Sequence, residues 1–99
     1  MIVWLDSDRY LDPKEPLTGK NLSHTNLDGY TFDGLDLTDT DLTGCSLIGA
    51  SFVGARLTRT RFDRAVLDLA DLSLTDLSTA SLVETSLQNT TVSRQSFAA

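Results

Sequence analysis

The sequence predicts a solenoid in which five-residue units wind and stack around one narrow core. Every fifth residue from Leu17 to Phe97 is a large apolar one, and all six glycines stand two residues after such a position. A period of five fits neither the 3.6-residue period of an α-helix nor the two-residue period of a strand. Because one unit cannot bury its apolar residue alone, successive units must stack on one another.

Each unit has two inward positions and three outward ones. The large apolar residue forms the centre of the unit, and a small residue stands two positions before it, so the two kinds can interdigitate at native packing density. Cys45 occupies a small inward position, and we interpret it as a buried packing thiol rather than a nucleophile. The outward positions hold turn-forming residues, and glycine marks a corner that needs a positive φ. The aspartates that precede several centres are interpreted as turn residues, not as an acid–base pair: Asp36, Asp41, Asp71 and Asp76.

Two departures from the pattern carry expectations of their own. Tyr30 and Leu35 put bulky side chains at the small inward position of consecutive units, so we expect a local bulge or an outward rotation there. The units after Gly54 lack glycine, so we expect their corners to use a different turn geometry.

Units such as ADLSL at 70–74 and TNLDG at 25–29 resemble the A(D/N)LXX pattern of the pentapeptide repeat family. The resemblance covers Leu17 to Phe97, which is most of the chain. It implies an all-β solenoid, a right-handed quadrilateral β-helix of about four coils with four pentapeptides in each coil. We therefore divide the chain into a β-helix over residues 17–99 and a capping segment over residues 1–16.

Residues 1–16 break the five-residue period but are rich in apolar side chains. We expect this segment to fold over the first coil as an apolar cap, with Pro13 and Pro16 setting the path into Leu17. The alternative is a disordered tail, although tails are seldom so apolar. The apolar residues of the segment are Met1, Ile2, Val3, Trp4, Leu5, Tyr10 and Leu11.

The period continues almost to the other end of the sequence, where no cap is expected. The last coil would expose four core side chains to water: Leu82, Leu87, Val92 and Phe97. Burial of each such side chain is worth about 1.5–3 kcal/mol. We therefore predict a homodimer joined through the C-terminal coils, since two-fold closure is the commonest arrangement, although another chain could close this end instead. Family members commonly pair in this way, which supports the prediction by analogy.

Composition narrows the classes of partner. The chain has 14 Asp and Glu residues against 8 Lys and Arg residues, a net charge of −6, which disfavours direct binding to nucleic acid. Its one cysteine excludes an intramolecular disulfide. The apolar run at the N-terminus is too short for a membrane span and follows no basic residues, so we expect a cytoplasmic protein with no membrane partner.

Four arginines in the middle of the chain suggest a phosphate-binding patch at first sight. With four units per coil, however, residues twenty apart become neighbours in adjacent coils. Each arginine then lies beside an acidic residue, so cross-coil ion pairs explain the run better than an anion site does. The expected neighbours are Asp36 and Asp76 for Arg56, Asp39 for Arg59, Asp41 for Arg61 and Glu84 for Arg64.

Five apolar residues occupy outward positions in the second and third coils. Ile48, Val66 and Leu69 belong to one side of the predicted coil, and Val53 and Leu74 belong to the next. A continuous apolar patch on a protein surface suggests a contact surface. The alternative is a set of scattered surface hydrophobes without a role.

No residue pattern indicates catalysis, a cofactor or a metal. His24 is the single histidine and stands in an outward turn, so neither a catalytic triad nor a zinc site is indicated. We therefore predict a non-enzymatic structural or interaction module that presents a rigid surface to a protein partner. The alternative comes from the family resemblance: some pentapeptide repeat proteins look like a B-DNA rod and bind type II topoisomerases such as DNA gyrase, and a net charge of −6 fits that reading.

Overall fold

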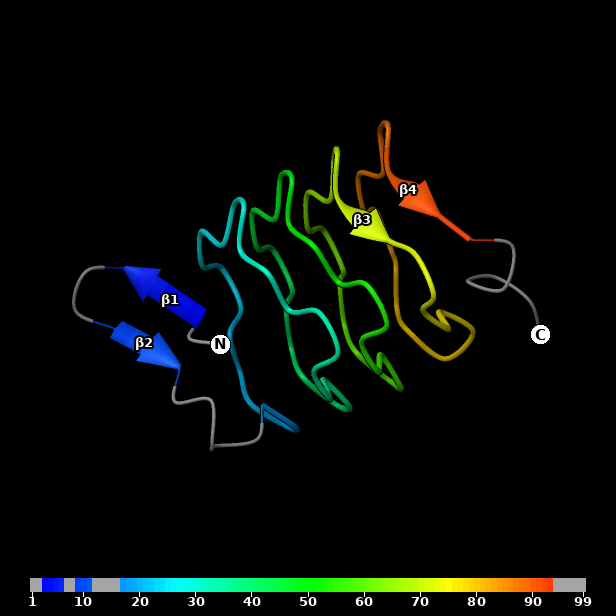
Figure 1. Cartoon of the computed structure of the whole chain (residues 1–99). Helices are drawn as coiled ribbons and strands as arrows, with labels where there is room; N and C mark the ends of the chain where they lie inside the picture. Colours follow the sequence, from blue (N-terminus) through cyan, green and yellow to red (C-terminus); the bar gives the residue numbers. More distant parts are fainter. Residues whose placement is uncertain (1–2, 7–8, 12–16, 94–99) are drawn as a thin grey trace.

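The computed structural model describes residues 3–6, 9–11 and 17–93 of the 99-residue chain. Strands β1 (Val3–Asp6) and β2 (Arg9–Leu11) form an antiparallel hairpin, and β3 (Asp71–Leu72) pairs in parallel with β4 (Thr91–Val92). Figure 1 shows the hairpin at the end of a stack of coils, beside the first coil.

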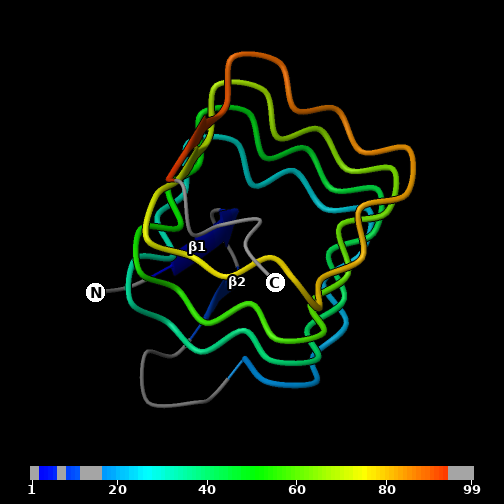
Figure 2. The same cartoon turned by 90° about the vertical axis from the view of Figure 1, so that its right-hand side faces the viewer.

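Residues 17–93 form the coils, and each coil takes twenty residues. Parallel bridges join residues twenty apart on all four sides, as in Asn21 to Asp41, Asn26 to Ser46, Thr31 to Ser51 and Asp36 to Arg56. Seen along its axis, the stack has a four-sided outline (Figure 2). The predicted right-handed quadrilateral β-helix is confirmed. Its sides are so short that most hold one isolated bridge rather than a strand of several residues.

We name the four sides as walls A to D, each built from one unit per coil. Wall A comprises residues 20–24, 40–44, 60–64 and 80–84; wall B 25–29, 45–49, 65–69 and 85–89; wall C 30–34, 50–54, 70–74 and 90–93; wall D 17–19, 35–39, 55–59 and 75–79. The last residue of each unit stands at the corner before the next wall.

Backbone hydrogen bonds join the coils in a repeating pattern. The amide of a centre donates to the carbonyl nineteen residues later, as Leu27 does to Ser46 at 2.7 Å. The corner amide does the same, as Gly29 does to Ile48 at 2.9 Å. Because both bonds require the corner amide and the centre amide to point along the axis, corners that take part in them have nearly the same conformation.

The corners show why the predicted change of turn geometry after Gly54 is wrong. Fourteen corner residues have positive φ: six are glycines, and eight carry side chains with φ between 54° and 65°. A positive φ at the third residue of a four-residue turn is the mark of a type II turn. The turn is therefore the same with or without glycine, and the bonds between coils impose it. The side-chain-bearing corners are His24, Asp39, Arg59, Arg64, Leu69, Leu74, Glu84 and Asn89.

Thr79 is the corner in residues 17–93 that does not have positive φ. A β-branched residue is especially costly in the left-handed region. Here the Arg59 amide donates to the Thr79 hydroxyl at 3.1 Å, in place of the usual carbonyl. This corner, just before the last coil, is thus the irregular one within the described β-helix.

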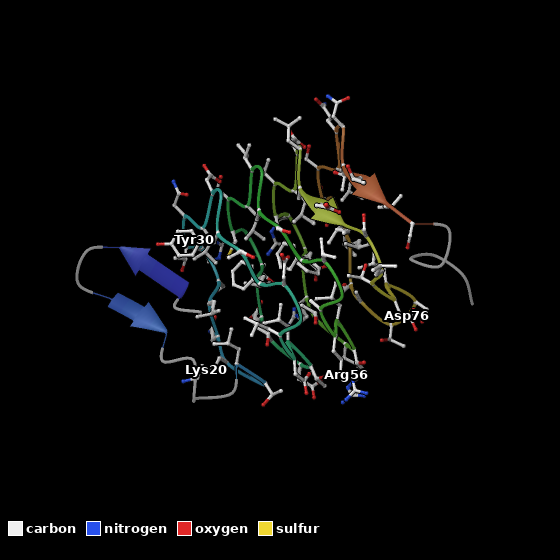
Figure 3. All side chains as sticks on the ribbon, viewed as in Figure 1. Lys20, Tyr30, Arg56 and Asp76 are labelled. Carbon is white, nitrogen blue, oxygen red and sulfur yellow. The ribbon has the colours of Figure 1, made fainter. Side chains whose placement is uncertain are left out.

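The predicted bulge at Tyr30 and Leu35 is also wrong. The Tyr30 amide donates to the Leu27 carbonyl at 3.1 Å, and the Tyr30 carbonyl accepts from Ser51 at 2.9 Å, as in a regular unit. Leu35 makes the matching pair of bonds, and both side chains are half-buried against the core. Both belong to the first coil, which has a neighbouring coil on one side only, so neither side chain meets a preceding coil; Figure 3 shows Tyr30 at that end of the stack.

The core is a column of centres and small residues along the axis. Phe32 stacks on Phe52 with ring centroids 4.9 Å apart, and Phe52 meets Phe62 edge to face at 5.7 Å. Several hydroxyls and the thiol at small inward positions donate to a carbonyl of the preceding coil, as Thr60 does to Leu37 at 2.7 Å. Cys45 is fully buried and donates to the Leu22 carbonyl at 2.9 Å, in agreement with a packing role.

Candidate functional site: walls B and C

Aspartates at the position before a centre close their own turn. The Asp71 carboxylate accepts from the amide of Ser73 at 2.9 Å and from its hydroxyl at 2.6 Å. These hydrogen bonds hold the pKa of Asp71 below its ordinary value, and Ser78 does the same for Asp76. Asn26 makes the equivalent bond to the Asp28 amide at 3.0 Å without a charge. The interpretation of these residues as turn formers is confirmed.

A second set of aspartates, at the position after a centre, joins one coil to the next. Asp28 accepts from the Ser46 hydroxyl at 2.5 Å and from the Ile48 amide at 2.9 Å, and Asp33 makes the same contacts with Ser51 and Val53. A serine eighteen residues after the aspartate is the shared signal. The sequence analysis missed this spacing, which recurs in the pairs Asp63–Ser81 and Asp68–Ser86.

The acidity of the β-helix therefore has a structural explanation. All nine aspartates of residues 17–93 accept a hydrogen bond from a turn, from the next coil or from an arginine. None of these nine carboxylates lacks a hydrogen-bond donor. The aspartates of the β-helix thus follow from how its turns and coils are joined.

The predicted arginine pairs are only partly formed. Arg59 binds Asp39 through two bonds, Nε to Oδ1 at 2.7 Å and Nη2 to Oδ2 at 2.9 Å, and these bonds lower the pKa of Asp39. Arg61 lies 3.9 Å from Asp63 of its own unit instead of bonding to Asp41. Within residues 17–93, Arg56 and Arg64 form no ion pair within 4 Å, because a long exposed side chain gains little from one fixed partner.

Among the described residues, neither His24 nor a carboxylate belongs to a group that could hold a metal ion. The His24 ring lies across Gly44, where an added Cβ would stand 2.5 Å from Nδ1. Within the described part of the chain, no group of three or more His, Cys, Asp or Glu side chains could hold a metal ion. Burial raises the pKa of the Cys45 thiol, which disfavours the nucleophilic thiolate.

The five predicted contact residues fall into two matching pairs and one separate residue. Ile48 and Leu69 stand in adjacent coils at the corner between walls B and C, twenty-one residues apart. Val53 and Leu74 repeat this arrangement one wall further, at the corner between walls C and D. Val66 is half-buried on wall B, where it bridges to Ser46 and Ser86. We call the two pairs the paired corners.

Leu69 and Leu74 are the most exposed large apolar residues of the described β-helix. Their relative exposures are 62% and 70%, and both have positive φ, 65° and 60°. The left-handed conformation costs a residue with a Cβ roughly 1–2 kcal/mol. The corners directly below them are Gly49 and Gly54, whose φ values are close to theirs and whose surroundings are open. Leucine is thus placed where glycine would be less strained and would expose no apolar surface.

Val83 is an exposed apolar residue that the sequence analysis missed. It is 58% exposed on wall A and stands directly after a centre, the position that Ile48 and Val53 also occupy. The same reasoning about outward positions would have found it. It lies in the last coil, near the C-terminal end of the stack.

Comparison with known proteins identifies the repeat. The family profile described as pentapeptide repeats matches residues 17–44 with 8 copies. The repeat of this chain is thus similar to the pentapeptide repeats of that family. A search among curated proteins finds no match. Within residues 3–6, 9–11 and 17–93, no helix has the length and apolar character needed to cross a membrane.

Two solved structures of pentapeptide repeat proteins are similar to this chain. One is from the thylakoid lumen of Arabidopsis thaliana, with 29% identity over 76% of this chain and a TM-score of 0.60. The other is Rfr23 from the cyanobacterium Cyanothece 51142, with 29% identity over 76% of this chain and a TM-score of 0.56. This chain spans 48% and 54% of their lengths, or about half.

Proposed function

We propose that this protein is a non-enzymatic interaction module that binds a protein partner through walls B and C. The observation that carries the proposal is the pair Leu69 and Leu74, which are exposed and held at positive φ. Strained residues that also sacrifice solubility point to a role outside folding. Ile48 and Val53 extend the same surface into the coil below, and Val66 adds to wall B.

The test replaces the two leucines by asparagine, which tolerates the left-handed conformation. Leu69→Asn plus Leu74→Asn should leave thermal stability equal or higher, because strain falls and no core contact is lost. Recovery of the partner from source lysate on immobilised protein, quantified by mass spectrometry, should fall at least about tenfold, as loss of about 1.4 kcal/mol implies.

Val83→Asn is the matched control, since it removes an equally exposed apolar side chain from wall A. It should not change recovery of a partner that binds walls B and C. Equal recovery of every protein by wild type and the double variant would overturn the proposed surface.

We further propose that two copies pair through the C-terminal coils. Leu82 and Leu87 are only partly buried and Val92 is 41% exposed, whereas Phe97 lies outside the described residues. Light scattering at micromolar concentration should give a dimer mass, and Val92→Asp should give a monomer. A monomer mass for the wild-type protein would refute the dimer.

The DNA-mimic alternative comes from the family resemblance and fits the net charge of −6, although the aspartates of residues 17–93 also have structural roles. It nevertheless has a direct test. If DNA gyrase is the partner, micromolar protein should inhibit supercoiling of a plasmid, and unchanged supercoiling would dispose of the alternative.

A further inference from the structure

Charges are divided unevenly among the four walls. All five Lys and Arg residues of residues 17–93 lie on walls A and D, and none lies on walls B and C. Figure 3 shows Lys20 and Arg56 on the edge of the stack away from the turns that precede β3 and β4. Walls B and C instead carry only carboxylates, namely Asp28, Asp33, Asp68 and Asp71.

Turn chemistry explains where these carboxylates stand, but it does not explain the absence of cations around them. Outward positions on walls A and D accept lysine or arginine in several coils, and Arg59 and Arg64 even occupy corners. The corresponding corners on walls B and C hold Leu69 and Leu74. Nothing in the fold forbids a cation there, so within residues 17–93 the absence of cations from walls B and C is a property of the sequence and not of the fold.

Each paired corner has a carboxylate bonded to its lower residue. Asp28 accepts from the Ile48 amide and Asp33 from the Val53 amide, both at 2.9 Å through Oδ1. The hydroxyls of Ser46 and Ser51 donate to the same Oδ1 atoms, and both aspartates are exposed. The two apolar sites therefore share one arrangement, in which an apolar pair stands above an exposed aspartate.

Asp71 adds a third charge on wall C, between the corners that hold Leu69 and Leu74. Hydrogen bonds from Ser73 lower the pKa of Asp71, so it is ionised at neutral pH. The three extended residues of a wall span about 10 Å. Two turns of an α-helix rise about 10.8 Å, so apolar residues one heptad apart match the spacing of the two corners.

We propose that walls B and C bind a cationic amphipathic helix of a partner protein, with leucine-type side chains on the paired corners and lysine or arginine facing Asp28, Asp33 and Asp71. This inference rests on the proposed function and names the chemistry of its partner. Charge complementarity speeds encounter and fixes orientation, while the apolar contacts supply affinity. The same carboxylates repel phosphate, so nucleic acids and anionic lipid surfaces are excluded from these walls.

The probe is a labelled helical peptide with leucines at heptad spacing and lysines between them. Fluorescence anisotropy measures its affinity, and amide chemical shifts of the protein locate its site. Shifts should concentrate on walls B and C, and Leu69→Asn plus Leu74→Asn should abolish binding. Asp28→Asn plus Asp33→Asn should weaken it about five- to tenfold at low salt, with less effect at high salt.

Asp36→Asn plus Asp76→Asn is the matched control, because it makes the same change in net charge on wall D. Asparagine keeps the Oδ1 acceptor that aspartate uses both within a turn and between coils, and Asn26 already accepts a turn hydrogen bond in this way. Binding by this control within twofold of wild type supports the proposal, whereas equal weakening by both double variants overturns it by showing a response to net charge alone.

A second peptide, with glutamine in place of lysine, separates this inference from the proposed function. If the neutral peptide binds walls B and C as tightly, the cationic class is overturned while the interaction surface stands. If neither peptide binds, the helix is overturned as the ligand, and the lysate experiment alone decides the proposed function.

Discussion

The two ends of the stack are built from the same repeat but differ in burial. At the N-terminal end, the first four centres are nearly or completely buried: Leu17 and Leu22 are 5% and 8% exposed, and Leu27 and Phe32 are fully buried. At the C-terminal end, Leu82 and Leu87 are only partly buried and Val92 is 41% exposed. The hairpin of β1 and β2 lies beside the first end (Figure 1).

This difference shows that the burial of the centres of a coil depends on the neighbours of that coil and not on its own sequence. Stability of such proteins is roughly a sum of unit terms and interface terms between neighbours. A coil with a partner on both sides buries its centres, and a coil with one partner does not. That residues 1–16 cap the first coil stays a prediction, and Pro13 and Pro16 lie outside the described residues.

The largest expected effect comes from removing the cap. Deletion of residues 1–11 should expose the four centres of the first coil, each worth about 1.5–3 kcal/mol, and so lower the free energy of unfolding by several kcal/mol. Urea unfolding followed by circular dichroism measures the loss. An unchanged midpoint would show that the segment is not a cap.

A smaller difference in the free energy of unfolding should distinguish two centres of wall B, Leu27 in the first coil and Leu87 in the last. Leu27→Ala removes a fully buried side chain and should cost about 3 kcal/mol, whereas Leu87→Ala should cost about 1 kcal/mol because its site is already partly hydrated. The two costs should become equal only if a second copy covers Leu87. Measuring both variants at two protein concentrations therefore tests the cap and the dimer together.

The smallest effect is a dependence on pH that differs between the ends. Asp71 and Asp76 have lowered pKa values in the folded state, so they stabilise it above their ordinary pKa and lose that contribution as pH falls below about 4. On walls A and B of the first coil, Asn21 and Asn26 fill the same role and do not titrate, whereas Asp36 on wall D does.

Hydrogen exchange at pH 3 should therefore show lost protection over residues 71–93 before residues 21–29. Asp71→Asn should reduce that difference. If the first coil loses protection first, the turn carboxylates do not control the stability of the C-terminal coils in acid.

The period of five predicted the core and the coil because each centre must face the axis. Four units per coil also predicted that residues twenty apart are neighbours in adjacent coils. Arg59 and Asp39 confirm this prediction, because two hydrogen bonds join their side chains. The twenty-residue spacing did not predict the partner of Arg61, because it fixes where the backbone of a residue lies but not where the charged end of a long side chain lies.

The corner conformation could not be predicted from local preference. Leucine seldom adopts positive φ, yet Leu69 and Leu74 do so because their amides donate to Gln88 and to the Ser93 hydroxyl in the next coil. Contacts twenty residues away thus decide the conformation. For the candidate site, the five apolar positions came from sequence, whereas their pairing at two corners and the strain of the leucines needed the structure.

The corners also bear on how such a protein can change over evolutionary time. Because hydrogen bonds between coils fix the corner backbone, glycine, charged residues, amides and leucine all occupy the same turn. A substitution there alters what the surface offers without disturbing the centres. The corner positions of a pentapeptide therefore determine its surface, and the centre positions determine its folding. A lineage can thus acquire a new partner through changes at the corners while its core stays unchanged.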